Sequence, residues 1–586
     1  MNLIHNKDMA TTLPNSPPPS SLFASIDMGT NSFKLLIVRA DPSGQFLTLN
    51  HHKEPVLLGL NSTPTNPFAI SNQSHLLALQ TLQNFQNLLL SHQVIPDHTR
   101  CVATAAIREA TNGNELVECV KERVGLEVEV LSGEEEARLV YKGVLQFLPL
   151  VYEKLVLVID IGGGSTEFVV GKGGKACFGA SLKLGHVNLT EKFVKQGDHN
   201  VGDMREFIRL VIEESGVVER IKEFGGVEMV VGCSGTIRAV EKAVFYGYAK
   251  SEMFENDNVV LFEEWKRDWR FSRRELSGVV ERLCDGREGE KARRDKFFNR
   301  RSEFIVAGAV LLEEIFEVIG IENMEVSGYA LGEGVIAESL GKVYGGSDLN
   351  ANVRWMSVVQ LAMRFNSKKS MRVAAQCAGI AKVIFEGLRE CEEVAASLNE
   401  RDLEYLEAAC LLHSVGLFMG KKGYHKQSYR IIKDGGHLHG YSTEEVKLMA
   451  LLARHHRKKF PKSDHASLIA FSNEVKQKFR SLCAIVRISV ALQQHQCINI
   501  QEMVFSISHE GFKLEIGDSK DQNLLPTTAQ PLAVDTVAES GKELENFKKV
   551  DFLTCLLDYD LIFGRYFHEC GLNCKVYVFK IYFICI

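Results

Sequence analysis

The sequence predicts an α/β protein with two related domains, followed by an all-α region and a small region that contains strands. Three observations carry this prediction. A strand–loop–strand pattern occurs twice, over residues 23–41 and 155–171, and such internal similarity points to a duplicated domain. A linker rich in Gly, Ser and Asn at 341–352 is followed by helical periodicity over 353–494. Strand alternation returns from Val504.

The chain has 586 residues, which is more than one hydrophobic core usually serves, so we expect several domains. Its 45% apolar and 24% charged residues are ordinary for globular proteins. The predicted divisions are a disordered segment at 1–22, α/β domains at 23–145 and 146–340, a helical domain at 353–498, a small α/β region at 499–570 and an atypical tail at 571–586.

Charge and cysteine content exclude several classes of protein. The net charge of −6 argues against general nucleic-acid binding, which favours basic surfaces. The 14 cysteines contain no CxxC pair, so neither a zinc site nor a disulfide framework is indicated. No apolar run of about 18 residues is present, so we expect no membrane partner. The Pro/Ser-rich start matches neither a signal nor a transit peptide, which favours the cytoplasm.

Individual elements follow from local periodicity. Residues 75–90 and 303–320 have the apolar spacing of helices. Residues 504–508 and 512–517 form a strand–turn–strand pattern. A strand leading into a helix is predicted at 99–112, 126–144, 227–244 and 324–340. The last residues, "NCKVYVFKIYFICI", do not resemble a domain edge; we interpret them as an artefact of the gene model, with an edge strand as the alternative.

The stretch "IDIGGGSTE" at 159–167 has the chemistry of a phosphate loop. A strand follows it, so it is neither a Walker loop nor a dinucleotide fingerprint. Glycines expose backbone N–H groups without a Cβ in the way, and such groups form anion-binding concavities. The alternative is a tight hairpin whose glycines serve only the turn. Carboxylates that could hold Mg²⁺, which prefers oxygen ligands, are Asp27, Asp160 and Glu167.

A helix that begins after Ser132 carries three consecutive acids. Ser132 and Glu135 form a capping-box pattern, and acids at this end suit the helix dipole. Glu136 is not explained by the cap. A carboxylate near two phosphate loops could act as a general base, although its spacing alone favours a purely structural role.

Two further segments could bind anions. Arg108 could clamp a phosphate through two hydrogen bonds, or make a surface ion pair. In "GCSGTIR" at 232–238, small residues and a Thr begin a helix, which is a potential anion site. The alternative there is a simple N-cap by Ser234 or Thr236.

The helical region contains clustered histidines. The His-Asp pair of metal-dependent phosphohydrolases reads His413-Ser414 here, and without the carboxylate a metal site is not favoured. We interpret these histidines as packing or polar surface. "RHHRKK" at 454–459 is interpreted as a solvated helix end that could also attract a long polyanion.

Seven segments in order resemble the exopolyphosphatase/guanosine pentaphosphate phosphohydrolase (Ppx/GppA) family of the actin–hexokinase–Hsp70 superfamily. The resemblance runs from about Phe23 to Gly517. The segments are "IDMGTNSFKLLI", "VATAAIREATN", "LSGEEEARLVYKGV", "VIDIGGGSTEFVVG", "SLKLGHVNLTEKF", "GCSGTIRAVEKAV" and "RSEFIVAGAVLLE".

The resemblance implies two actin-like (ribonuclease H-like) domains around a cleft, an HD-like helical domain and, usually, a homodimer. It implies that Glu136 activates the attacking water and that Arg108 contacts phosphate. Asp160 and Glu167 would help bind Mg²⁺, with Asp27 in the matching first loop. The phosphate-binding positions would be Gly29, Thr30, Asn31, Ser32, Gly162, Gly163, Gly164, Ser165, Thr166, Ser234, Gly235 and Thr236.

The chain departs from the family pattern at two places. The family's "SDGxLREG" reads "SGYALGEG" here, so Gly328 and Gly332 replace an Asp and an Arg. The family's His-Lys-His-Ser reads "HKQS", with Gln427 in place of His. Every carboxylate of the expected cleft is retained.

The expected activity is that of an exopolyphosphatase, which removes the terminal phosphate of inorganic polyphosphate with Mg²⁺. The alternative is 5′-phosphohydrolysis of guanosine pentaphosphate by the same chemistry. A non-catalytic phosphate or nucleotide sensor is a third possibility, which the retained acids Glu136, Asp160 and Glu167 disfavour. Fold alone does not decide among them.

Overall fold

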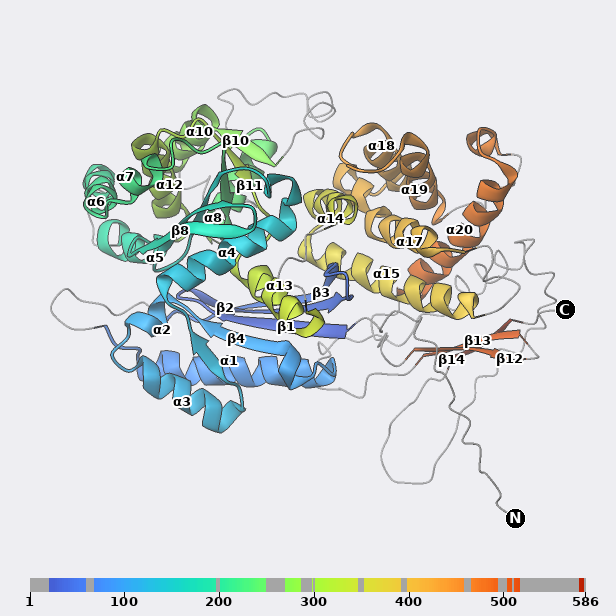
Figure 1. Ribbon diagram of the computed structural model, residues 1–586, viewed down its shortest axis with the longest axis horizontal. Helices are drawn as coiled ribbons and strands as arrows, with labels where there is room; N and C mark the ends of the chain where they lie inside the picture. The colour runs from blue at the N-terminus through green and yellow to red at the C-terminus, as the bar shows by residue number, and fades with distance from the viewer. Residues whose placement is uncertain are drawn as a thin grey trace, which may run out of the picture.

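The computed structural model describes residues 21–58, 68–195, 201–248, 269–285, 298, 301–345, 352–390, 398–457, 465–493, 503–508, 511–516 and 579–583. Figure 1 shows two α/β halves stacked on each other and a helical region beside them.

The first sheet has the strand order β3-β2-β1-β4-β5. Its strands are β1 (Ser21–Met28), β2 (Ser32–Ala40), β3 (Phe46–Pro55), β4 (Thr99–Ala103) and β5 (Val128–Val130). β1, β2 and β3 form an antiparallel meander, and β4 and β5 then add in parallel beside β1.

The second sheet repeats this connectivity. Its order is β10-β11-β9-β6-β7-β8, with β6 (Val156–Ile161), β7 (Thr166–Lys172), β8 (Lys175–Leu182), β9 (Met229–Cys233), β10 (Arg270–Ser272) and β11 (Asn323–Val326). β6, β7 and β8 form the antiparallel meander, and β9 and β11 follow in parallel. The shared topology confirms the predicted duplication and the actin-like fold class.

Helices cover both faces of each sheet. One face of the first sheet packs on α1 (Asn72–Ser91) and α3 (Gly113–Val124), with α2 (Ala105–Glu109) beside them. One face of the second sheet packs on the helices α5 (His186–Leu189), α6 (Val201–Glu214), α7 (Val217–Lys222), α8 (Ser234–Phe245), α10 (Arg273–Cys284) and α12 (Ile305–Ile319). The expected helices at 75–90 and 303–320 correspond to α1 and α12.

Two helices cross between the halves. α4 (Gly133–Phe147) packs on the second sheet, and α13 (Leu331–Tyr344) packs on β1 and β2 of the first, as Figure 1 shows. The two backbones touch at Gly143 and Gly334. A Cβ at Gly143 would lie 2.0 Å from the Ala330 carbonyl oxygen, and one at Gly334 would lie 1.8 Å from that of Leu139. Only residues without a side chain allow this approach.

The helical region begins at Val353, as predicted. It contains α14 (Val353–Phe365), α15 (Lys368–Arg389), α17 (Glu400–Leu412), α18 (Tyr424–Asp434), α19 (Thr443–His455) and α20 (Asn473–Gln493). In the part of the chain that the structure describes, no helix is both long and apolar enough to cross a bilayer.

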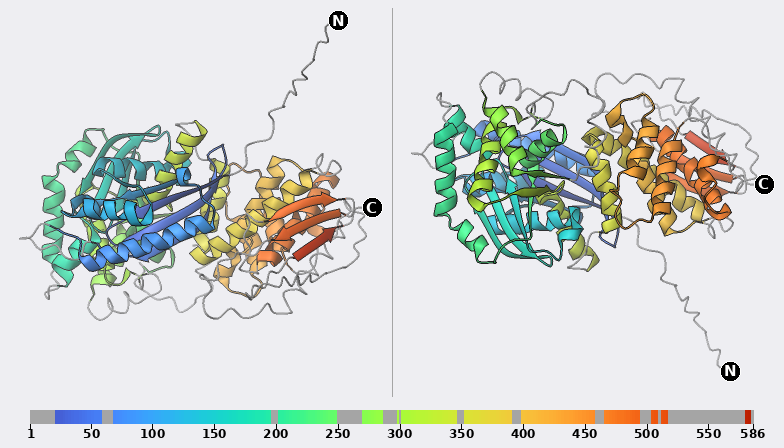
Figure 2. Two further views of the ribbon diagram at one scale, coloured as in Figure 1. Left: turned by 90° about the horizontal axis from the view of Figure 1, so that it is seen from below. Right: turned by 90° about the horizontal axis from the view of Figure 1, so that it is seen from above.

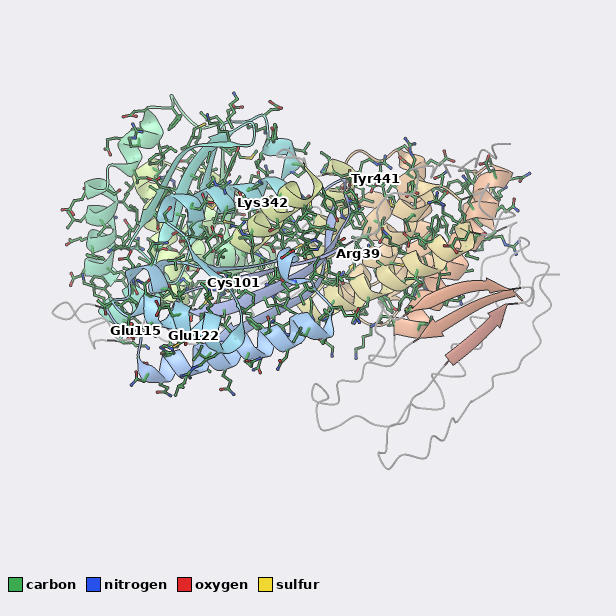
Figure 3. All side chains as sticks on the ribbon, turned by 60° about the horizontal axis from the view of Figure 1, so that its bottom comes forward. Arg39, Cys101, Glu115, Glu122, Lys342 and Tyr441 are labelled. Carbon is green, nitrogen blue, oxygen red and sulfur yellow. The ribbon has the colours of Figure 1, made fainter. Side chains whose placement is uncertain are left out.

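This region is joined to the α/β halves by a continuous core that includes Phe23, Phe147 and Trp355. Two ion pairs cross the boundary. Arg39 of β2 pairs with Glu407, and Arg364 pairs with Glu241 of α8. Figure 3 shows Arg39 where the first sheet meets the helices. The Arg364–Glu241 pair is almost fully buried, and breaking a buried ion pair strongly destabilises a protein.

A three-stranded antiparallel sheet lies at the far end of the helical region (Figure 2). Its strands are β12 (Val504–Ser508), β13 (Gly511–Ile516) and β14 (Phe579–Phe583). β14 lies within the predicted atypical tail and pairs with β13 at the edge of the sheet. This agrees with the alternative interpretation of the tail, which was an edge strand. Residues 517–578 and the N-terminal segment 1–20 lie outside the described residues.

Candidate active site

The two repeated hairpins place charged residues in the same register. Asp27 of β1 is the direct partner of Lys34 on β2, and Asp160 of β6 is the direct partner of Glu167 on β7. Lys34 Nζ donates to Asp27 Oδ2 at 2.7 Å. The first hairpin therefore opposes an acid to a base, whereas the second opposes two acids.

The turns of the two hairpins face each other. A Cβ at Gly163 would lie 3.2 Å from Thr30 Cβ and 3.3 Å from Asn31 Cβ, and a Cβ at Gly164 would lie 2.8 Å from Thr30 Oγ1. Gly162 N–H closes its own turn on the Ser165 carbonyl at 2.8 Å. We call residues 27–34 and 160–167 together the loop junction. Larger residues at these glycines would push the halves apart.

The loop at 234–236 lies beside the second hairpin. Ser234 has a positive φ of 66°, and its hydroxyl donates to the Ile161 carbonyl at 2.9 Å. The alternative interpretation, an N-cap by Ser234 or Thr236, is wrong, because the N-cap residue is Cys233 and no side chain caps the helix. Thr236 is buried, and Gly235 lies under the guanidinium of Arg301.

α4 brings Glu136 to the loop junction. The Ser132 side chain accepts from Glu135 N–H at 3.1 Å, so the N-cap is confirmed. The second hydrogen bond of the predicted capping box, from the Ser132 backbone N–H to the Glu135 carboxylate, is absent, because this carboxylate pairs with Arg138 instead.

Glu136 is buried and accepts a 3.0 Å hydrogen bond from Arg108 Nη1. The same nitrogen donates to the Leu131 carbonyl at 2.8 Å, and Arg108 Nε lies 3.9 Å from Oε1 of the partly exposed Glu109. Arg108 therefore holds the buried Glu136 as well as making the ion pair that the sequence offered as the alternative.

Four carboxylates lie close enough to perturb one another. Burial, together with the charges of Asp27 and Asp160, raises the pKa of Glu136 to about 7, against the lowering effect of Arg108. Burial and the charges of Glu136 and Asp160 raise the pKa of Glu167 well above its usual range, although Ser165 and Ser181 donate hydrogen bonds to it. Burial also raises the pKa of Asp160. Such crowding of acids is typical of functional sites.

The acids at the loop junction fit a hard divalent cation. Among the described residues, no group of three or more His, Cys, Asp or Glu side chains forms a ready metal cage. Mg²⁺ needs no such cage, because it usually takes one or two carboxylates and completes its shell with waters and substrate phosphates. The opposed pair Asp160 and Glu167 suits this role, whereas Asp27 is already paired with Lys34.

Several cations near the loop junction were missed by sequence reasoning. They are Lys34, Lys53, Arg238, Arg301 and Lys368. Desolvation and the charges of neighbouring cations lower the pKa of Lys53 to about 7, of Lys368 to about 8 and of Arg301 to about 10. Lys34 alone had a local signal, because a hairpin centred on 29–31 pairs it with Asp27. Arg238 and Arg301 lie in segments that had been singled out from the sequence, at 232–238 and 301–313. Lys53 and Lys368 have no local signal.

His186, at the start of α5, was also missed. Its Nε2 lies 3.4 Å from Asn31 Nδ2 of the first hairpin. Burial and the charges of Arg301 and Lys53 lower its pKa to about 3, so the ring is neutral at physiological pH. A neutral imidazole beside the loop junction can exchange hydrogen bonds without adding charge.

Three histidines of the helical region, His413, His455 and His456, pack inside it. His413 and His456 are buried with ring centroids 4.9 Å apart, and Tyr424 OH lies 2.9 Å from His456 Nε2. The expected solvated helix end at 454–459 is therefore wrong for His455 and His456, which are both buried. Lys458 and Lys459 lie outside the described residues.

Gly328, which stands where the family pattern has an Asp, has a steric explanation. A Cβ there would lie 2.6 Å from Cε2 of Phe147, so the space next to the backbone is filled by an aromatic ring. Gly332 differs, because a Cβ there would meet Ser25 Oγ at 3.4 Å and nothing closer.

Comparison with known proteins agrees with this geometry. Residues 36–343 match the model of the Ppx/GppA phosphatase family, and residues 353–532 match that of Ppx/GppA phosphatase domain III. The chain belongs to the Ppx/GppA phosphatase family. It is accordingly a hydrolase of phosphoanhydride bonds.

Solved structures that resemble this Ppx/GppA protein include the Aquifex aeolicus family member, at 29% identity and a TM-score of 0.44, covering 56% of this chain and 99% of that one. Another is an exopolyphosphatase from Cytophaga hutchinsonii ATCC 33406, at 26% identity and a TM-score of 0.47, covering 56% of this chain and 100% of that one.

Proposed function

We propose that this protein is an exopolyphosphatase, which releases orthophosphate from the end of inorganic polyphosphate with Mg²⁺. One observation carries the choice of substrate. The carboxylates of the loop junction are bordered by a group of cations, and Lys53, Lys368 and Arg301 form no direct ion pair with an acid among the described residues. A long row of phosphates would satisfy more of these cations than the nucleoside part of guanosine pentaphosphate would.

The residues of the loop junction have distinct tasks in this reaction. Phosphoryl transfer depends on positioning and on neutralisation of charge more than on covalent chemistry. When bound, Mg²⁺ would neutralise charge on the phosphates, held by Asp160 and Glu167. Glu136 accepts the proton of the attacking water, and its raised pKa suits a base that works near neutral pH.

Arg108 orients this base. Its Nη1 holds the Glu136 carboxylate and is itself fixed by the Leu131 carbonyl. A phosphate bound beside Glu136 would contact the rest of the guanidinium. The alternative substrate is guanosine pentaphosphate, which needs the same groups. The homodimer and the cytoplasmic location stay predictions.

The test compares substrates on the full-length protein. Orthophosphate release is measured with Mg²⁺ on long polyphosphate, tripolyphosphate and guanosine pentaphosphate, and again after chelation with EDTA. We expect the highest kcat/KM on long polyphosphate, loss of activity with EDTA and recovery when Mg²⁺ is restored. A clear preference for guanosine pentaphosphate would favour the alternative, and activity that survives EDTA would contradict the role of Mg²⁺.

A further inference from the structure

Three residues form a row across neighbouring strands of the second sheet. Asp160 of β6 is the direct partner of Glu167 on β7, and Glu167 is in turn the direct partner of Ser181 on β8. Direct partners on neighbouring strands lie on the same face of a sheet. The row therefore places one hydroxyl group beside the two opposed acids.

The first sheet has the equivalent row with a different third residue. There Asp27 of β1 pairs with Lys34 of β2, and Lys34 pairs with Lys53 of β3. The duplicated topology thus puts a hydroxyl at Ser181 where the first sheet has an ammonium group. A lysine beside Glu167 would supply a fixed positive charge, as Lys34 does for Asp27. A serine donates a hydrogen bond and leaves the charge of the carboxylate in place.

Both hydroxyl groups that reach Glu167 donate to the same oxygen. Ser181 Oγ donates to Glu167 Oε1 at 2.8 Å, and Ser165 Oγ donates to that atom at 2.6 Å. Among the residues that the structure describes, no donor is bonded to Oε2. Because Glu167 is buried, an oxygen without a hydrogen bond is unfavourable there unless a ligand takes it. The protein therefore uses Oε1 and leaves Oε2 available to a ligand.

The side chain of Ser181 is enclosed from its other side by the beginning of α4. α4 packs against β8, as Figure 1 shows. A Cβ at Gly133, the first residue of α4, would lie 2.6 Å from Ser181 Cβ and 3.4 Å from Ser181 Oγ. The backbone of the helix thus lies directly against this serine. Ser181 stands between Glu167 and the helix that carries Glu136.

We propose that Ser181 is a positioning residue for the divalent cation: together with Ser165 it holds Oε1 of Glu167, so that Oε2 is the atom that binds the cation. This inference rests on the proposed function, which requires Mg²⁺ at Asp160 and Glu167. Mg²⁺ demands near-ideal geometry of its ligands, so a carboxylate that is free to rotate binds it less well. In this assignment the hydroxyl proton of Ser165 serves Glu167 rather than a phosphate.

The test uses full-length Ser181→Ala and Ser165→Ala, with Cys177→Ala as the matched control. Cys177 lies on the same strand as Ser181 and is exposed. Mn²⁺ is the probe, because it also takes oxygen ligands. Its binding is measured by electron paramagnetic resonance, on the protein alone and with orthophosphate. Loss of a hydrogen bond that orients a metal ligand typically weakens metal binding by about 10–100-fold, so we expect about tenfold weaker binding in each serine variant. Cys177→Ala should match the wild type.

Two further measurements separate positioning of the ligand from support of the fold. The Mg²⁺ concentration for half-maximal release of orthophosphate from long polyphosphate should rise about tenfold in Ser181→Ala, with kcat at saturating Mg²⁺ changed less than about threefold. Urea unfolding with EDTA should show that the variant remains folded. A less stable Ser181→Ala with wild-type Mn²⁺ binding would overturn the proposal.

Equal Mn²⁺ binding by Ser181→Ala and Cys177→Ala would overturn the positioning role while leaving the exopolyphosphatase assignment intact. If the wild type hydrolyses neither polyphosphate nor guanosine pentaphosphate, the proposed function fails. Mn²⁺ binding then still tests the role of Ser181: weaker binding by Ser181→Ala than by Cys177→Ala supports it, and equal binding overturns it. A wild type that binds Mn²⁺ neither alone nor with orthophosphate would overturn it as well.

Discussion

Asp160 and Glu167 lie directly opposite each other on β6 and β7, at the position where the first hairpin pairs Asp27 with Lys34. The duplicated hairpins thus share a register but differ in charge. Two opposed and buried acids are unfavourable unless one is protonated or a cation lies between them.

We expect Glu167→Gln to make the protein more stable and less active. Because burial and its acidic neighbours raise the pKa of Glu167, the folded protein binds this proton more tightly than the unfolded chain. Wild-type stability without divalent cations should therefore fall as pH rises above the usual carboxyl range. The variant should lack this loss and be about 1 kcal/mol more stable at pH 8, yet have little activity. Urea unfolding with EDTA and orthophosphate release with Mg²⁺ measure the two effects; a variant less stable than the wild type would contradict the argument.

Glu136→Gln should remove turnover but not binding. The amide keeps the shape of the side chain and loses the basic oxygen, so kcat should fall by about 10²–10⁴. Phosphate release and equilibrium binding of polyphosphate measure the two properties. Glu134→Gln is the control: Glu134 lies two residues before Glu136 on the same helix and is exposed, so this variant should keep wild-type kinetics. Normal turnover in Glu136→Gln would remove this residue from the mechanism.

The activity should depend on pH through the same residue. Only the ionised carboxylate accepts a proton, and the pKa of Glu136 is raised to about 7, so kcat/KM should decline as pH falls through this value. Arg108 lowers this pKa by its hydrogen bond and charge. Arg108→Gln should therefore move the midpoint of the pH profile to higher pH, besides lowering the plateau. A midpoint that moves to lower pH would mean that Arg108 does not act on Glu136.

Where α4 and α13 cross, neither Gly143 nor Gly334 should tolerate a side chain. We expect Gly334→Ala to destabilise the protein by about 3 kcal/mol, because its Cβ would lie 1.8 Å from the Leu139 carbonyl oxygen. Gly332→Ala on the same helix meets no such obstacle and should be neutral or stabilise by about 0.5–1 kcal/mol through helix propensity. Urea unfolding of both variants measures the difference; equal stability would show that the helices can separate at little cost.

Local sequence predicted most of the fold. The repeated strand–loop–strand pattern identified the duplicated sheets, and the linker and periodicity identified Val353 as the start of the helical region. Among the site residues, Asp27, Asp160 and Glu167 followed from the hairpin pattern, since residues seven apart across such a turn become strand partners. Glu136 did not follow from spacing, because a capping acid and a catalytic acid look alike at the start of a helix. Its importance came from the family resemblance.

The sequence by itself determined the elements, their order and the chemistry of the two loops, because these depend on neighbours within a few residues. Only the tertiary structure decided which charges meet. It pairs Arg108 with Glu136, buries His455 and His456 in the helical core, and gathers Lys53, Arg301 and Lys368 from three distant segments. It also places Gly143 against Gly334. Such contacts depend on how whole helices and sheets pack, and no local pattern records that.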